Sequence, residues 1–142
     1  MYSGYSRSPS EVNAVTTGSE ISMPKSEWAI MECLWEKAPL TVTQIARAME
    51  EETGWAKSTT KTLISRMTTK GYLCFKEGDK AREYYPAFPR SEAVLAETEG
   101  FLSRLYEGSL GMMVNTLVDQ KGLSRHEIRE LRAILDRIDE VK

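Results

Sequence analysis

The stretch from 54 to 71, GWAKSTTKTLISRMTTKG, begins and ends with glycine and carries apolar residues at helical spacing. At about 100° per residue, Leu63, Ile64 and Met67 fall on one side of a helix, the spacing of an apolar face against a core. Gly71 readily adopts the left-handed conformation with which helices commonly end. The stretch therefore predicts one short helix between the two glycines, buried along one side.

The opposite side of this expected helix is rich in hydroxyl groups, and its margins are cationic. The hydroxyl residues are Ser58, Thr62, Ser65 and Thr69, and the cations on the flanks or ends are Lys57, Lys61, Arg66 and Lys70. Hydroxyls form hydrogen bonds with base edges and phosphates, and Lys and Arg neutralise the backbone charge of DNA. The pattern is typical of a helix that lies in a DNA major groove. The alternative on these residues alone is an ordinary amphipathic helix with a solvated polar face.

Charge is unevenly distributed along the chain, whose formal net charge is −2. Residues 57–82 contain seven Lys or Arg and two acidic residues, a balance of +5. Residues 91–142 contain seven basic and ten acidic residues, a balance of −3. A single basic segment on an otherwise acidic chain allows a protein to approach DNA with one face.

Composition argues against several other classes of protein. The 142 residues are 41% hydrophobic and 28% charged, which is ordinary for a globular protein, and no apolar run approaches the ~20 residues of a membrane span. No signal peptide is visible, so we expect a cytoplasmic protein with no membrane partner. Cys33 and Cys74 show neither metal-ligand spacing nor a disulfide framework, and we expect both to be buried free thiols. We expect no metal and no cofactor.

Residues suited to catalysis are not recognisable in the sequence. The only histidine, His126, lies between Arg125 and Glu127 in the opening turn of an expected helix, where an exposed surface position is the simpler interpretation. The sequence contains no Ser/His/Asp order, glycine-rich phosphate loop or metal cluster. We therefore expect that the protein is not an enzyme.

A helix is expected to begin near Pro24, because proline is tolerated in a first turn. Its apolar residues at helical spacing, all expected in the core, are Trp28, Ile30, Met31, Leu34 and Trp35. Pro39 should stop this helix, and residues 40–42 are expected to form a very short strand.

A second helix is expected to start at Thr41, which with Gln44 fits the capping-box pattern, and to run to about Thr53. Gly54 then separates it from the hydroxyl-rich helix by only a few residues. Two short helices joined by a tight turn form a helix-turn-helix, in which the second helix carries the polar stripe.

The sequence YLCFKEGDKAREYYPAF follows, with a turn at Gly78-Asp79 between two short strands. This pattern predicts a β-hairpin, which after a recognition helix is the wing of a winged helix. Lys76, Lys80 and Arg82 would place positive charge at its edge, near the flanking phosphates.

Three further helices are expected: one from Ser91 to near Gly108, a second over about 110–121, and a last one that carries Ile128, Leu131, Leu135 and Ile138. Ser124 with Glu127 makes another capping box, and Leu123 with Ile128 fits a hydrophobic staple. Three short helices make a thin core on their own, so their apolar faces are expected to pack against a second copy of the chain. The alternative is that they fold back on the winged helix. The expected dimer contacts are Phe101, Leu105, Met113, Leu117, Ile128, Leu131, Leu135 and Ile138.

The expected organisation is therefore a disordered tail at 1–20, a DNA-binding domain at 21–89 and a helical dimerisation domain at 90–142. The fold class is mainly α. It comprises a winged helix-turn-helix, with three helices and a small β-hairpin wing, and a three-helix C-terminal region.

Three segments resemble the BlaI/MecI/CopY family of bacterial repressors, also called penicillinase repressors. They are SEWAIMECLW at 26–35, GWAKSTTKTLISRMTTKGYL at 54–73, and FLSRLYEGSL at 101–110 followed by LSRHEIRELRAIL at 123–135. The resemblance covers about 21–142. It implies a dimeric winged-helix repressor, palindromic operators with TACA and TGTA elements, and C-terminal helices as dimer arms. A sensor protease or a small effector is the implied regulatory partner.

The sequence departs from the family pattern at three places. The chain lacks the cysteine-rich C-terminal motif of copper-responsive members, which argues against copper sensing of that type. The Asn-Phe bond that is cleaved in β-lactam-responsive members corresponds here to Thr116-Leu117, which does not match. Thr60 stands where many members carry valine.

The main hypothesis is a sequence-specific DNA-binding transcriptional repressor that binds a double-stranded palindromic operator as a homodimer. The alternative is a winged-helix module that binds proteins without specific DNA binding. Arg66 has its own alternative, an ion pair with an acidic residue of the same domain. The expected DNA contacts are Lys57, Ser58, Thr59, Lys61, Thr62, Ser65, Arg66, Lys80 and Arg82.

Overall fold

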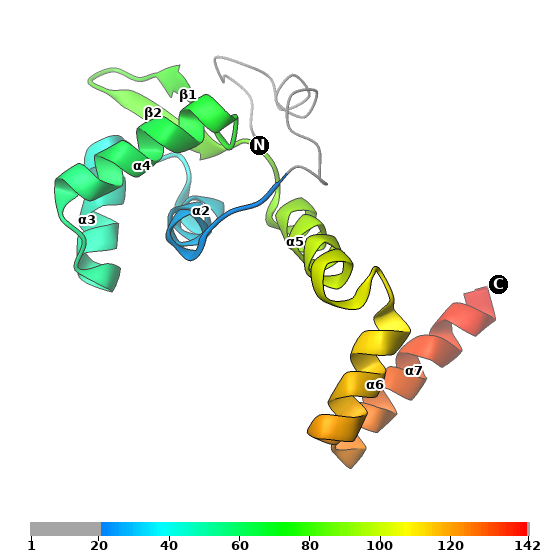
Figure 1. Cartoon of the computed structure of the whole chain (residues 1–142). Helices are drawn as coiled ribbons and strands as arrows, with labels where there is room; N and C mark the ends of the chain where they lie inside the picture. The colour runs from blue at the N-terminus through cyan, green and yellow to red at the C-terminus, as the bar shows by residue number, and fades with distance from the viewer. Residues whose placement is uncertain (1–20, 142) are drawn as a thin grey trace. The chain divides into compact units, whose positions relative to one another are not determined.

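The computed structural model describes residues 21–141, and the expected disordered tail at 1–20 lies outside the described part (Figure 1). The described residues form two compact units, one ending at Gly100 and the other beginning at Phe101. The elements are α2 (Lys25–Lys37), α3 (Val42–Thr53), α4 (Lys57–Lys70), β1 (Leu73–Glu77), β2 (Arg82–Pro86), α5 (Arg90–Tyr106), α6 (Leu110–Gln120) and α7 (Arg125–Val141).

Helix α2 starts directly after Pro24, as expected, and ends before Pro39. Ile30, Met31 and Leu34 form its buried face. The expectation for the tryptophans was only partly right, because Trp28 and Trp35 are half-buried at the edge of the core, with ring centroids 5.4 Å apart. An indole N–H needs a polar partner, and that of Trp35 donates to the Phe88 carbonyl oxygen at 2.8 Å.

Helix α3 begins with the expected capping box, in which the side chains and backbone N–H groups of Thr41 and Gln44 bond reciprocally. Leu40 pairs with Tyr84 as an isolated bridge, so the short strand expected at 40–42 was wrong; Val42 already belongs to α3. Gly54 ends α3 with φ of +80°, a conformation that L side chains rarely adopt. Helix α4 therefore follows α3 after a tight turn.

The two strands form the expected antiparallel hairpin, with Leu73 opposite Pro86 and Glu77 opposite Arg82. The turn is closed by a hydrogen bond from the Gly78 N–H to the Ala81 carbonyl oxygen, 3.0 Å long. A Cβ at Gly78 would lie 2.5 Å from that oxygen, so this turn requires glycine. The winged helix-turn-helix expected from the sequence is thus present.

The first unit has one core, to which α2, α3, α4, the hairpin and the start of α5 all contribute. Cys33 and Cys74 are buried in this core and not joined by a disulfide, and burial raises the pKa of the Cys33 thiol. Ile21 and Met23 are buried as well, in an extended segment that precedes α2.

The second unit consists of the end of α5, α6 and α7. Ser109 caps α6 by accepting a hydrogen bond from the Met112 N–H. The capping box expected at the start of α7 is present, with Ser124 and Glu127 bonded reciprocally at 2.9 and 3.0 Å. Hydrogen bonding by Ser124, through its backbone and its side chain, lowers the pKa of Glu127.

Within residues 21–141, no helix is both long and apolar enough to cross a lipid bilayer. That same part of the chain holds no group of three or more His, Cys, Asp or Glu side chains suited to a metal ion.

Candidate DNA-binding surface

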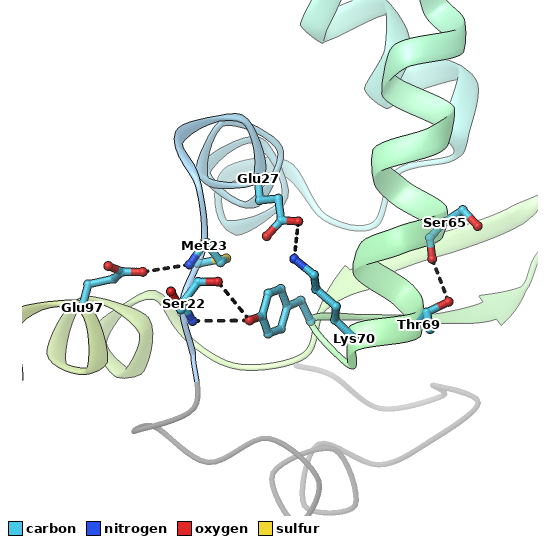
Figure 2. A network of polar contacts seen from close by, with 8 residues as sticks. Ser22, Met23, Glu27, Ser65, Thr69, Lys70 and Glu97 are labelled. Atoms are coloured by element: carbon cyan, nitrogen blue, oxygen red, sulfur yellow. Dashed lines mark hydrogen bonds and ion pairs between the residues drawn. The ribbon is translucent and has the colours of Figure 1, made fainter. Parts of the chain in front are cut away.

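Helix α4 divides its side chains between core and solvent as the sequence predicts. Leu63, Ile64 and Met67 are buried. Ser58, Thr62 and Ser65 are exposed, and their hydroxyls form no hydrogen bond with the described residues. Thr69 differs from them, because its hydroxyl donates to the Ser65 carbonyl oxygen at 3.1 Å (Figure 2). Three hydroxyl groups are therefore available to a ligand along one exposed face.

The cations of α4 fall into two groups. Lys57, Lys61 and Arg66 are exposed, and within residues 21–140 none of them forms an ion pair, including the one considered for Arg66. Lys70 lies at the end of α4, where its Nζ is 2.7 Å from Oε2 of Glu27 (Figure 2). Three cations thus border the hydroxyl face, whereas Lys70 forms an ion pair with Glu27 of α2.

The Glu27–Lys70 pair joins two helices. The Glu27 side chain is only 2% exposed, so its charge would be costly without a cation beside it. The Lys70 Nζ also lies 5.4 Å from the centroid of the Tyr72 ring. This pair fixes the end of α4 against α2.

The wing is less cationic than expected, because two of its three cations are paired across the strands. Arg82 contacts Glu77 at 3.1 Å and stacks on the Phe75 ring at 4.2 Å. Hydrogen bonds to the side chains of Tyr84 and Glu77 raise the pKa of the Arg82 guanidinium.

The other pair, Lys76 with Glu83, is 3.9 Å long. Lys80 is exposed in the turn and forms no ion pair with the described residues. Lys80 is therefore the wing cation left available to a phosphate.

The sequence matches the penicillinase repressor family over residues 23–137. The chain belongs to this family. It is 30% identical over 112 residues to the methicillin resistance regulatory protein MecI of Staphylococcus aureus, covering 79% of this chain and 91% of that one. It is 26% identical over 111 residues to the penicillinase repressor of Bacillus licheniformis, covering 78% and 87%.

Among solved structures, the DNA-binding domain of the repressor BlaI matches 54% of this chain and 92% of its own, with 19% identity and a TM-score of 0.46.

This penicillinase repressor family member carries a hollow of about 450 Å³ beside α4 that sequence analysis did not indicate. Arg66, Thr59 and Leu63 line it together with two residues from outside α4, Trp55 and Ser26. Ser58 and Thr62 complete the lining. The sequence signal that could have indicated this hollow is Trp55, because a large apolar side chain is unusual in the turn directly after Gly54.

The C-terminal unit of this family member exposes much of its apolar surface. None of the eight expected dimer contacts is buried: Phe101, Leu105, Leu117, Leu131, Leu135 and Ile138 are exposed, and Met113 and Ile128 are intermediate. No described residue after Ala96 is buried. The three helices therefore lack a closed core within one chain.

Proposed function

We propose that this protein is a transcriptional repressor that binds a palindromic DNA operator as a homodimer, with α4 as its recognition helix. The observation that carries the proposal is the exposed face of Ser58, Thr62 and Ser65, whose hydroxyls have no partner in the described part of the chain. Such groups are suited to reading base edges, and the MecI protein that this chain resembles is named as a regulatory protein.

Of the cations beside this face, Lys57 and Arg66 would contact the DNA backbone, and Lys61 would face the bases. Lys57, Lys61 and Arg66 are exposed and unpaired within the described residues, so approach to DNA requires no ion pair to be broken. Lys80 would add one contact from the wing. Contacts of this kind position a protein on the duplex, and the hydroxyl face would supply sequence preference.

The apolar surface of the second unit supports the dimer. Large residues of α5, α6 and α7 such as Leu105, Leu110 and Leu135 are 58–60% exposed. A chain that left so many large apolar residues in water would lose the free energy of burying them and would tend to aggregate. Burial against a second copy removes this surface and pairs two recognition helices for the two halves of a palindrome.

A gel-shift titration over a range of salt concentrations tests the proposal. The probe is a duplex with inverted TACA and TGTA elements, and a scrambled duplex serves as competitor. A dimer that neutralises about six phosphates gives a logarithmic salt slope of about −5, since each phosphate contributes about −0.9. No shift, or a shift with a flat salt response, would favour a protein-binding module instead.

Lys61→Ala separates base reading from phosphate contact. If Lys61 reads a base, the variant should lose about 1–3 kcal/mol of operator binding and little binding to scrambled DNA. Lys121→Ala, which removes an exposed lysine from the second unit, is the matched control and should leave the affinity unchanged.

A further inference from the structure

We infer that the hollow beside α4 binds one phosphate of the DNA backbone together with its deoxyribose, and that Trp55 and Ser26 are DNA contacts additional to those of the recognition helix. The inference rests on the proposed function, because its ligand is DNA. It assigns a contact to the α3–α4 turn and to the start of α2.

The backbone at Trp55 is held in place by the preceding turn. The Thr53 hydroxyl donates to the Met49 carbonyl oxygen at 2.6 Å and accepts from the Trp55 N–H at 3.2 Å. Gly54 between them has φ of +80°. The Trp55 ring is half-buried and packs against the core, so its position is set before any ligand arrives.

The indole N–H of Trp55 has no hydrogen-bond partner among the residues that the structure describes. Trp35 provides the contrast, since its N–H donates to the Phe88 carbonyl oxygen. An indole N–H can only donate, so the partner of Trp55 must be an acceptor.

The rest of the lining also favours an acceptor that carries negative charge. Ser26 and Thr59 contribute hydroxyls, Arg66 contributes a guanidinium that forms no ion pair with the described residues, and no carboxylate of those residues lines the hollow. Ser26 stands in the first turn of α2, whose N-cap, Pro24, provides no side-chain cap. The uncapped N–H groups at a helix N-terminus favour an anion.

The apolar part of the lining identifies the kind of anion. The Trp55 ring and Leu63 form an apolar surface, which offers no favourable contact to a free inorganic anion. A nucleotide unit of a DNA strand has both parts, because its deoxyribose is largely apolar and its phosphate is charged. The hollow also shares Ser58 and Thr62 with the exposed hydroxyl face, so a strand bordering the major groove would pass it.

Trp55→Phe tests the inference, because it keeps a smaller aromatic ring and removes the indole N–H. Fluorescence anisotropy would be measured on a labelled inverted-repeat duplex and on a scrambled duplex. A hydrogen bond to a charged group predicts binding at least about 10-fold weaker on both duplexes. The salt slope should stay the same, because indole is neutral, whereas Arg66→Gln should reduce its magnitude by about 0.9 for each phosphate no longer neutralised.

A methylphosphonate scan of the duplex locates the contact. Neutralising the phosphate that occupies the hollow should weaken wild-type binding, and it should weaken Trp55→Phe by less, because only the Arg66 contact to that phosphate is then left to lose. Additive losses at every position of the scan would overturn the inference. Ser26→Ala, on a different element, should show the same non-additivity at the same phosphate.

Trp35→Phe is the matched control, because it removes an indole N–H that the fold uses. It should lower the thermal midpoint and leave DNA affinity unchanged, whereas Trp55→Phe should weaken DNA binding. If wild-type protein binds DNA but Trp55→Phe binds equally well, this inference fails and the proposed function stands. If wild-type protein binds neither duplex, the proposed function itself fails.

Discussion

Thr60→Val should make the protein more stable, although it alters a residue of α4, the proposed recognition helix. The Thr60 side chain is fully buried, and its hydroxyl oxygen has no hydrogen-bond partner among residues 21–140. A buried polar group without a partner costs about 1–3 kcal/mol, and valine has nearly the same shape and helix propensity as threonine. We therefore expect the free energy of unfolding to rise by about 1–2 kcal/mol.

Urea unfolding at a fixed protein concentration measures this change, because the midpoint of a dimer depends on concentration. Thr60→Ser is the matched variant: it keeps the hydroxyl, loses a methyl group and should be destabilised by about 1 kcal/mol. DNA affinity should not change in either variant, since Thr60 lies inside the molecule. A lower midpoint for Thr60→Val would refute the reasoning, because it would mean that the hydroxyl has a partner in solution.

Three further predictions concern charge and the apolar surface. Lys70→Met removes the cation beside the buried Glu27 carboxylate and should lower the free energy of unfolding by roughly 3 kcal/mol, as followed by urea unfolding. Lys80→Ala should reduce the magnitude of the salt slope of DNA binding by about 0.9 per phosphate contact, whereas Arg82→Ala should change it less because that guanidinium is already paired; equal effects would contradict the pairing. Leu131→Asp places a charge in the apolar surface of the second unit and should dissociate the dimer, so an unchanged sedimentation mass would count against the dimer.

Local features of the fold followed directly from the sequence. The Thr41–Gln44 and Ser124–Glu127 boxes each depend on residues three apart, and both formed as predicted. The hairpin turn at Gly78 is equally local. Signals of this kind are readable because both partners lie within one turn of the chain.

The pairings of side chains were less predictable, because they depend on how distant elements pack. Lys70 meets Glu27 across 43 positions, and nothing near Lys70 in the sequence indicates that partner. The expected positive edge of the wing was partly wrong for a related reason. The register that puts Glu77 opposite Arg82 decides whether Arg82 is paired.

Within the candidate site, the sequence predicted only the arrangement of the residues that share helix α4. The helical period correctly separated Ser58 and Thr62 from Leu63. The hollow depends on Trp55 and Ser26, which come from a turn and from another helix. Helical periodicity carries no information about side chains that arrive from elsewhere in the fold.

The extended segment before α2 has a consequence for cleavage of the chain. Ser22 uses both its backbone N–H and its carbonyl oxygen to bond the Tyr72 hydroxyl, at 3.3 and 3.1 Å, and the Met23 N–H donates to Glu97 on α5 at 2.9 Å (Figure 2). A protease that cut after Met23 would release the segment from both neighbours and uncover the space filled by Ile21 and Met23. Tyr72, which follows the end of α4, and the first turns of α5 would then lose the segment that both of them contact, so a cut in this segment would also alter how the protein holds DNA.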